Sequence, residues 1–189
     1  MDRTVAIGIQ SFEDIVINNC FYIDKTEFIR EWWDGMDSVT LITRPRRFGK
    51  TLTMSMLEQF FSIEYSGRSD LFCRFNIWNY EKYRKLQGTY PVISMSFARI
   101  KETRYVDTVE KIYQIIKNLY VKFSYILDGN MLCEADMIYF KRILTGQMNE
   151  TDATSSLYQL SYFLYRYYGR KVIILLDEYD TPMQEAYLN

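Results

Sequence analysis

Residues 41–54 read LITRPRRFGKTLTM and place a basic turn between an apolar run and an amphipathic segment. The usual phosphate-binding loop reads G-x-x-x-x-G-K-[ST]. Gly49, Lys50 and Thr51 match the second half of this pattern, whereas Arg44 occupies the position of the first glycine. The stretch indicates a strand-to-helix junction, where unpaired backbone N–H groups and the helix dipole favour an anion.

The two halves of this loop differ in how well they fit the pattern. Arg44 lacks the freedom of glycine to adopt a positive φ, and Pro45 shapes the turn in a different way. The half that contacts phosphate is intact, because Lys50 reaches the β and γ oxygens and the Thr51 hydroxyl is a ligand for Mg²⁺.

A second motif lies near the end of the sequence, where residues 172–180 read VIILLDEYD. The continuous apolar run predicts a strand that is covered on both faces, with Asp177 at its carboxyl end. In an open α/β sheet this end is where ligands bind and where the Gly-Lys-Thr turn also lies. A carboxylate there holds Mg²⁺, usually through a water, and Glu178 is placed to polarise the water that attacks the γ-phosphate.

Each motif also has a plain structural interpretation. Residues 44–51 fit a solvated basic turn, and residues 174–180 fit a buried strand that ends in surface acids. Together they favour a nucleotide site, since each motif supplies what the other requires. That interpretation depends on both motifs lying in one pocket.

The remaining patterns predict the elements around these motifs. Strands are expected over residues 38–43, 90–97 and 172–176, and helices over residues 25–33, for about three turns after Thr51, and over 106–127, 134–144 and 152–168. Asp24 followed by Glu27 resembles a capping box, and Gly169 is a helix stop. The order of elements predicts an α/β domain with a parallel sheet.

Composition limits the chemistry that the chain can perform. With 189 residues, 48% of them hydrophobic, it is long enough for one domain with a real core. The absence of histidine excludes Ser-His pairs and His-ligated metals. The net charge of −1 gives the whole molecule no attraction to nucleic acid or membrane. Three cysteines without C-x-x-C spacing are interpreted as buried thiols, and no segment resembles a signal peptide or membrane span, so we expect a cytoplasmic protein.

Three stretches together resemble a known family. FEDIVINNCFYIDKTEFIREW (12–32), LITRPRRFGKTLTMSMLEQFF (41–61) and VIILLDEYDTP (172–182) are similar to the bacterial AAA-ATPase-like family of predicted P-loop ATPases. The resemblance covers essentially the whole chain, and the string RPRRFGKT is highly specific to it. It implies that Arg44 is the normal residue of the family at this position.

The resemblance implies a P-loop NTPase three-layer sandwich with a parallel sheet, incomplete at its C-terminal end. It divides the chain into an N-terminal segment, 1–36, that carries the box YIDKT, and a nucleotide-binding core, 37–189. It assigns the metal to Thr51 and Asp177, and catalysis to Glu178 and Lys50. The implied ligands are ATP and Mg²⁺. The residues implied to bind the nucleotide are Arg44, Pro45, Arg46, Arg47, Phe48, Gly49, Lys50, Thr51 and Leu52.

Several roles stay open at this point. Three roles are open for Arg46 and Arg47: they clamp the γ-phosphate, pair with acids on another element, or face a nucleic-acid backbone. The box YIDKT is interpreted either as an adenine contact or as helix capping by Asp24. Asp180 is interpreted as a support for the magnesium shell or as a surface acid.

The resemblance also defines what lies beyond these residues. Related ATPases insert a further strand between the strands of the two motifs, and family members often carry a PD-(D/E)xK nuclease-like domain, through which nucleic acid would be a partner. Without the inserted strand, buried N–H and C=O groups would lack partners, so we expect weak nucleotide binding and slow turnover from residues 1–189 alone.

Three functions are compatible with these observations. The first is Mg-dependent ATP hydrolysis coupled to a conformational change of a downstream domain or partner. The second is a nucleotide-gated interaction switch with little hydrolysis, and the third is a nucleic-acid-binding module that uses the RPRR turn. No membrane partner is expected, and the oligomeric state is open.

Overall fold

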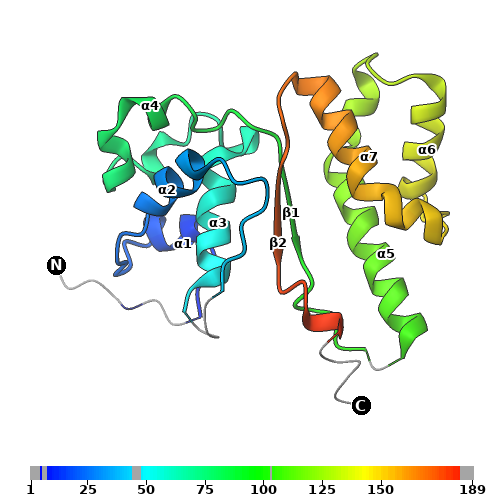
Figure 1. Cartoon of the computed structure of the whole chain (residues 1–189), viewed down its shortest axis with the longest axis horizontal. Coiled ribbons are helices and arrows are strands. Elements are labelled where there is room, and N and C mark those ends of the chain that lie inside the picture. The colour runs from blue at the N-terminus through cyan, green and yellow to red at the C-terminus, as the bar shows by residue number, and fades with distance from the viewer. Residues whose placement is uncertain (1–4, 6–7, 44–47, 103, 184–189) are drawn as a thin grey trace. The chain divides into compact units, whose positions relative to one another are not determined.

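The computed structural model describes residues 5, 8–43, 48–102 and 104–183 of the chain. The chain divides into two compact units, Met1–Val92 (unit 1) and Ile93–Asn189 (unit 2) (Figure 1). No helix within the described ranges combines the length and the apolar character that crossing a membrane requires.

Unit 1 consists of helices joined by short 3₁₀ turns. α3 confirms the helix expected after Thr51, and its residues Met56, Leu57 and Phe60 are buried at the predicted spacing. α1 packs against α3, and η3 packs against α2 and α4. The elements in chain order are α1 (Phe12–Ile17), α2 (Glu27–Gly35), α3 (Lys50–Phe61), η1 (Ile63–Tyr65), η2 (Ser69–Leu71), η3 (Asn76–Asn79) and α4 (Glu81–Arg84).

Aromatic side chains fill the centre of unit 1. Phe12 on α1 stacks on Phe72 with ring centroids 5.1 Å apart, and Phe60 on α3 meets the same ring edge-on at 5.0 Å. All three side chains are completely buried. Such ring pairs contribute roughly 0.5–1.5 kcal/mol each beyond their area burial. The cluster therefore holds α3, the helix that follows the basic turn, to the rest of the unit.

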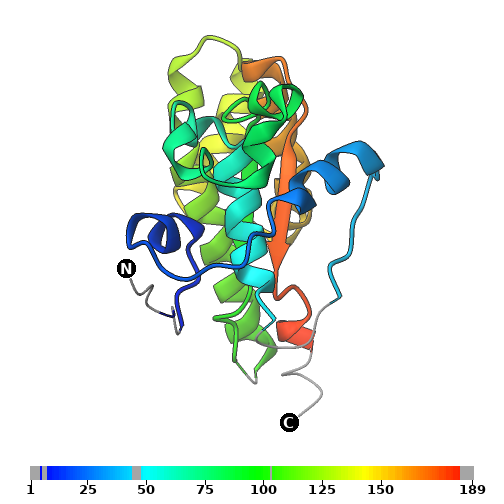
Figure 2. The same ribbon diagram turned by 90° about the vertical axis from the view of Figure 1, so that its left-hand side faces the viewer.

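The strand predicted over residues 38–43 is wrong. These residues form neither helix nor strand, and Val39 and Leu41 are 88% and 62% exposed. Figure 2 shows the segment as an extended coil that leads away from the end of α2. A strand is stable only with a ladder partner, and the described part of unit 1 has isolated bridges but no ladder.

The capping box predicted for Asp24 and Glu27 is also wrong. α2 begins at Glu27, two residues later than expected, and ends at Gly35. Its N-cap is Thr26, whose side chain makes no capping hydrogen bond. The reason is that Asp24 and Thr26 bind each other and η3 instead.

Unit 2 combines three long helices with a small sheet. The elements are β1 (Val92–Ser96), which starts at the unit boundary, α5 (Tyr105–Lys122), η4 (Ser124–Asp128), α6 (Glu134–Leu144), α7 (Glu150–Tyr168) and β2 (Ile173–Asp177). β1 and β2 pair as a two-stranded sheet and run in the same direction (Figure 1). This arrangement confirms an α/β class, while the three-layer sandwich stays a prediction.

The predicted elements of unit 2 are found with small changes at their ends. The strands over 90–97 and 172–176 and the helix over 134–144 are confirmed. The helix expected over 106–127 stops at Lys122, and a 3₁₀ turn continues through Asp128. α7 ends at Tyr168, and its C-cap is Gly169, whose φ of +64° is the left-handed value expected of a helix stop.

The core of unit 2 lies where β1, α5, α6 and α7 meet. Its buried members are Ile93, Met95, Ile116, Leu119, Tyr120, Phe123, Ile126, Phe140, Ile143, Met148, Leu160, Phe163 and Leu164. The prediction that β2 is covered on both faces holds for one face alone. Leu175 is buried, whereas Ile174 and Leu176 remain 44% and 39% exposed.

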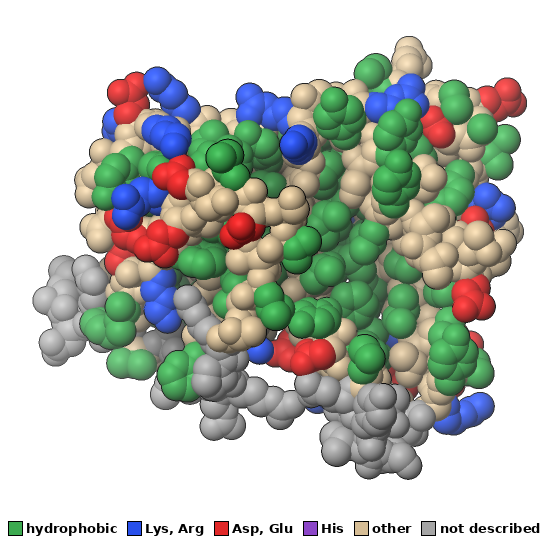
Figure 3. Space-filling view, viewed as in Figure 1, with side chains coloured by type: hydrophobic (Ala, Val, Ile, Leu, Met, Phe, Trp, Pro, Cys, Tyr) green, Lys and Arg blue, Asp and Glu red, His purple; other side chains and the backbone are tan. Residues whose placement is uncertain are grey.

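Charged side chains of both signs are interspersed on one face of the molecule (Figure 3). Figure 3 shows lysines and arginines mixed with aspartates and glutamates among the described residues of the face in view. This distribution agrees with the net charge of −1 in the sequence.

Candidate nucleotide site

The helix α3 begins at a left-handed glycine. Gly49 is its N-cap, with φ +77° and ψ 27°, a conformation that only glycine adopts at little cost. The Gly49 carbonyl oxygen accepts hydrogen bonds from both the amide and the hydroxyl of Thr53, each 2.9 Å long. These two hydrogen bonds from Thr53 to Gly49 form the first turn of α3, which contains the Gly-Lys-Thr sequence.

The N-terminus of α3 differs from those of α1 and α7. At α1 and α7 the side chains of Ser11 and Asn149 accept hydrogen bonds from first-turn amides. Gly49 has no side chain for this purpose, and the first turn of α3 contains no acidic residue. Such an N-terminus is suited to an external anion, because no carboxylate in the first turn of α3 neutralises the helix dipole.

Two further contacts hold α3 in place. The Ser55 hydroxyl accepts a hydrogen bond of 3.0 Å from the amide of Phe12 at the start of α1. The side-chain amide of the buried Gln59, also on α3, donates a hydrogen bond of 3.5 Å to the hydroxyl of Ser11, the N-cap of α1. A ligand at the start of α3 would therefore bind to a helix that is already anchored, which lowers the entropy cost of binding.

The box YIDKT forms a polar clamp between the start of α2 and η3. One carboxylate oxygen of Asp24 accepts from the Thr26 amide and hydroxyl at 2.8 and 2.7 Å, and the other accepts from the Asn76 amide at 2.8 Å. The Thr26 hydroxyl oxygen accepts from the buried amide of Ile77 at 3.2 Å. The adenine contact considered for this box stays a prediction.

Sequence interpretation missed the partners of this clamp. Asn76 and Ile77 contribute backbone amides, which leave no signature in the side-chain pattern of the segment NIWN. The available signal was the close spacing of Asp24 and Thr26, two residues whose short side chains readily bind nearby backbone.

The acidic pair lies at the end of β2. The carbonyl oxygen of Asp177 accepts a hydrogen bond of 3.0 Å from the amide of Phe97, the residue that follows β1. Glu178 comes next with φ +52°, a left-handed value that is strained for a residue with a side chain. The Thr181 amide then donates to the Glu178 carbonyl oxygen at 3.1 Å, and a helical turn covers residues 181–183.

The structure brings the predicted site residues together in two groups. Phe48 to Leu52 lie at the start of α3, where Phe48 is exposed and the others are half-buried. Asp177 and Glu178, also half-buried, lie at the end of β2. Residues 44–47, that is Arg44, Pro45, Arg46 and Arg47, lie outside the described residues. The assembly of both groups around one nucleotide stays a prediction.

Candidate metal ligands are few. Among the described residues, no group of three or more Cys, Asp or Glu side chains is arranged to hold a metal ion. All three cysteines are free, and the prediction that they are buried is right for Cys20 and wrong for Cys73 and Cys133. The metal proposed from the sequence would thus depend on Thr51, Asp177 and phosphate oxygens.

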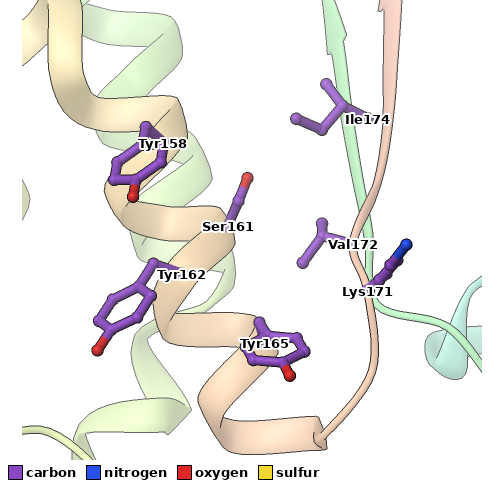
Figure 4. Close-up of a pocket in the computed structure, with 7 residues that line it drawn as sticks. All are labelled: Tyr158, Ser161, Tyr162, Tyr165, Lys171, Val172 and Ile174. Atoms are coloured by element: carbon purple, nitrogen blue, oxygen red, sulfur yellow. The ribbon is translucent and has the colours of Figure 1, made fainter. Parts of the chain in front are cut away.

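A groove in unit 2 has none of the predicted site residues in its lining. It has a volume of about 340 Å³ and is lined by Tyr158, Ser161, Tyr162, Tyr165, Lys171, Val172 and Ile174. In Figure 4, Val172 and Ile174 point from the start of β2 toward α7. The lining contains no carboxylate and a single ammonium group, so it lacks the converging polar groups of a catalytic centre. The groove also explains why Ile174 remains partly exposed.

Comparison with known proteins agrees with these features. The model of a family described as predicted AAA-ATPase matches residues 6–189, which include both groups of site residues. No curated protein and no solved structure gave a match. Because the family model matches nearly the whole chain, this protein belongs to the predicted AAA-ATPase family.

Proposed function

We propose that the chain binds and hydrolyses Mg·ATP, using the start of α3 for the phosphates and the end of β2 for the reaction. Membership of the predicted AAA-ATPase family supports a generic ATPase role. The main support for a phosphate site at this position is Gly49, the left-handed N-cap of α3. The first turn that follows it has no side-chain cap and no acidic residue. This arrangement suits the γ- and β-phosphates of a nucleotide.

The phosphates would be held by the segment from Arg44 to Leu52. Gly49 allows the backbone to approach a phosphate, and Lys50 supplies an ammonium group to the β and γ oxygens. Family membership supports ATP as the nucleotide.

Thr51 and Asp177 are the proposed ligands of the magnesium ion. Both offer the oxygen atoms that Mg²⁺ prefers, and the ion binds with one or two protein ligands when phosphates supply others. The lack of a larger acidic cluster among the described residues is compatible with this mode. When bound, the ion neutralises charge on the β and γ oxygens.

Glu178 is the proposed residue for the chemical step. Its carboxylate would accept a proton from a water whose oxygen forms a bond to the γ-phosphorus. The bond from the γ-phosphorus to the β–γ bridging oxygen breaks, and ADP and inorganic phosphate are the products. The strained φ of Glu178 supports this role, because such strain is concentrated at functional sites.

The hydrolysis cycle would drive a conformational change that is passed to a partner or a downstream domain. Nucleic acid is a candidate partner through a nuclease-like domain of the kind that related proteins carry. Oligomeric assembly is compatible with this function.

The first experiment is a thermal-shift titration of the 189-residue chain with ATP, ADP and GTP, with and without Mg²⁺. We expect a magnesium-dependent rise in Tm with ATP in the wild type and none in Lys50→Ala. Lys117→Ala is the matched control, because Lys117 is also half-buried in a helix and should leave the shift unchanged. Equal shifts for the wild type and Lys50→Ala would contradict the proposal.

Glu178→Gln separates hydrolysis from the nucleotide-gated switch. If hydrolysis normally clears the nucleotide, the variant should retain bound ATP, whereas the wild type releases ADP. Equal retention by both proteins would favour the switch. Binding to single-stranded nucleic acid that weakens steeply with salt and is indifferent to ATP and to Lys50→Ala would favour the nucleic-acid module instead.

A further inference from the structure

The side chain of Lys25 lies at the start of α3. A Cβ atom at Gly49 would stand 3.7 Å from the Lys25 Nζ, although the two residues are far apart in sequence. Lys50 follows Gly49 directly. Two lysines from separate segments of unit 1 thus meet at this glycine: Lys25 through its ammonium group, and Lys50 through its place in the chain.

The position of Lys25 is determined by the residues on either side of it. Asp24 is bound to the Asn76 amide, and Thr26 to the Ile77 amide, so the backbone of Lys25 is held at both ends. Thr26 is completely buried, whereas Lys25 itself is exposed. The clamp therefore holds the backbone on both sides of Lys25 and leaves its side chain exposed to contact a ligand.

The ammonium group of Lys25 lies beside the positive end of a helix dipole. Lys25 makes no ion pair with any residue that the structure describes, and the first turn of α3 contains no acid. A cation at a helix N-terminus is electrostatically unfavourable, because that end of the dipole is positive. Two ammonium groups at this end are stabilised if an anion of high charge lies between them.

We infer that Lys25 is a further phosphate-binding cation of this site, which contacts the polyphosphate chain of the nucleotide together with Lys50. The inference rests on the proposed function and adds a binding residue to it. In the box YIDKT, Asp24 and Thr26 would hold the backbone, and Lys25 would bind the ligand. The contact would be a charge-assisted hydrogen bond, the stronger class of such bonds.

The test compares Lys25→Met with Lys25→Arg in the 189-residue chain. Lys117→Met is the control, because the Lys117 Nζ lies 3.5 Å from the Cβ position of another left-handed glycine, Gly146. Affinity for a fluorescent ATP analogue with Mg²⁺ is measured by titration, and stability by urea unfolding.

We expect Lys25→Met to weaken binding by roughly tenfold or more, as for loss of a charged hydrogen bond. Lys25→Arg should keep most of the affinity, because it retains the charge, and Lys117→Met should bind like the wild type. The urea midpoint of Lys25→Arg should match that of the wild type, and that of Lys25→Met should equal or slightly exceed it, since Lys25 has no ion-pair partner among the described residues and its charge lies at the positive end of the helix dipole.

Two results would overturn the inference while leaving the proposed function in place. One is wild-type affinity in Lys25→Met when Lys50→Ala has lost binding. The other is a large fall in the stability of both Lys25 variants, which would reveal a structural role. Absence of binding by the wild type would overturn the proposed function itself, and the role of Lys25 with it.

Discussion

Gly49→Ala tests whether the start of α3 is a phosphate site. The substitution should lower the free energy of unfolding by a small amount that can be calculated, and any loss of nucleotide affinity is measured separately. Gly49 has a φ of +77°, and a residue with a side chain in this region is less stable by about 1–2 kcal/mol. Replacing glycine also restricts the unfolded chain, which offsets this cost by roughly 0.4–1 kcal/mol. The net loss of unfolding free energy should therefore be about 1 kcal/mol.

Steric clash should add little to this loss. The nearest described atom to a Cβ at Gly49, outside its chain neighbours and its own helix, is the Lys25 Nζ at 3.7 Å, an ordinary contact distance. For a chain of this size, about 1 kcal/mol corresponds to a fall in Tm of roughly 2–4 °C. Gly67→Ala is the matched control, because Gly67 has a φ of +82° and open space at its Cβ position.

The two variants should differ in nucleotide binding. The methyl group of Gly49→Ala would occupy the space next to the Lys25 ammonium, where a phosphate has to approach. We expect at least about a tenfold loss of affinity for Mg·ATP, equivalent to roughly 1.4 kcal/mol, and none in Gly67→Ala. Thermal unfolding and nucleotide titration of both proteins provide the measurements. Wild-type affinity in Gly49→Ala, at a similar loss of Tm, would refute the assignment of this turn to phosphate binding.

Three further predictions concern stability. Thr26→Val should lower the unfolding free energy by about 1–3 kcal/mol in a urea titration, because the buried amide of Ile77 loses its acceptor; an unchanged midpoint would show that the clamp contributes little. A hydrogen bond from the Lys82 ammonium lowers the pKa of Asp34 below its ordinary 3.8. The contact between Asp34 and Lys82 therefore adds to the free energy of unfolding above pH 3.8, and this contribution is lost as the pH falls below that value. The unfolding free energy of the wild type should thus fall more steeply with decreasing pH than that of Asp34→Asn. Glu178→Gly should relieve the left-handed strain and raise Tm slightly or leave it unchanged, while phosphate release from ATP stops; a marked fall in Tm would contradict the strain.

The long elements could be predicted from the sequence because their patterns are local. α6 was predicted with both its ends, and α7 ends at Tyr168, with Gly169 as its C-cap, as expected. In each, one apolar face recurs at helical spacing and the ends carry capping residues or glycine. β2 could likewise be recognised from its continuous apolar run followed by Asp177.

The errors occur where structure depends on distant partners. Residues 38–43 have the composition of a strand, but a strand also requires a neighbouring edge, and local composition does not specify one. Asp24 has the spacing of a capping residue, yet its carboxylate binds the amide of Asn76 instead. The short helix α1 depends on aromatic contacts such as that of Phe12 with Phe72, which no local pattern reveals.

The candidate site was predictable in part for the same reason. Gly49 to Thr51 and the acidic pair are contiguous motifs whose chemistry can be read from the residues alone. The proximity of Lys25 to Gly49 could not be predicted, since it arises from the way the box YIDKT folds back onto unit 1.

The clamp between the box YIDKT and η3 has a consequence for how this region tolerates substitution over evolutionary time. Because η3 contributes backbone N–H donors, substitutions at position 76 should not break the clamp, and the buried position 77 needs only an apolar side chain. Proline is the exception at both positions, since it has no N–H to donate. The permitted variation at η3 is thus set by the backbone, whereas Asp24 and Thr26 are restricted by their own functional groups.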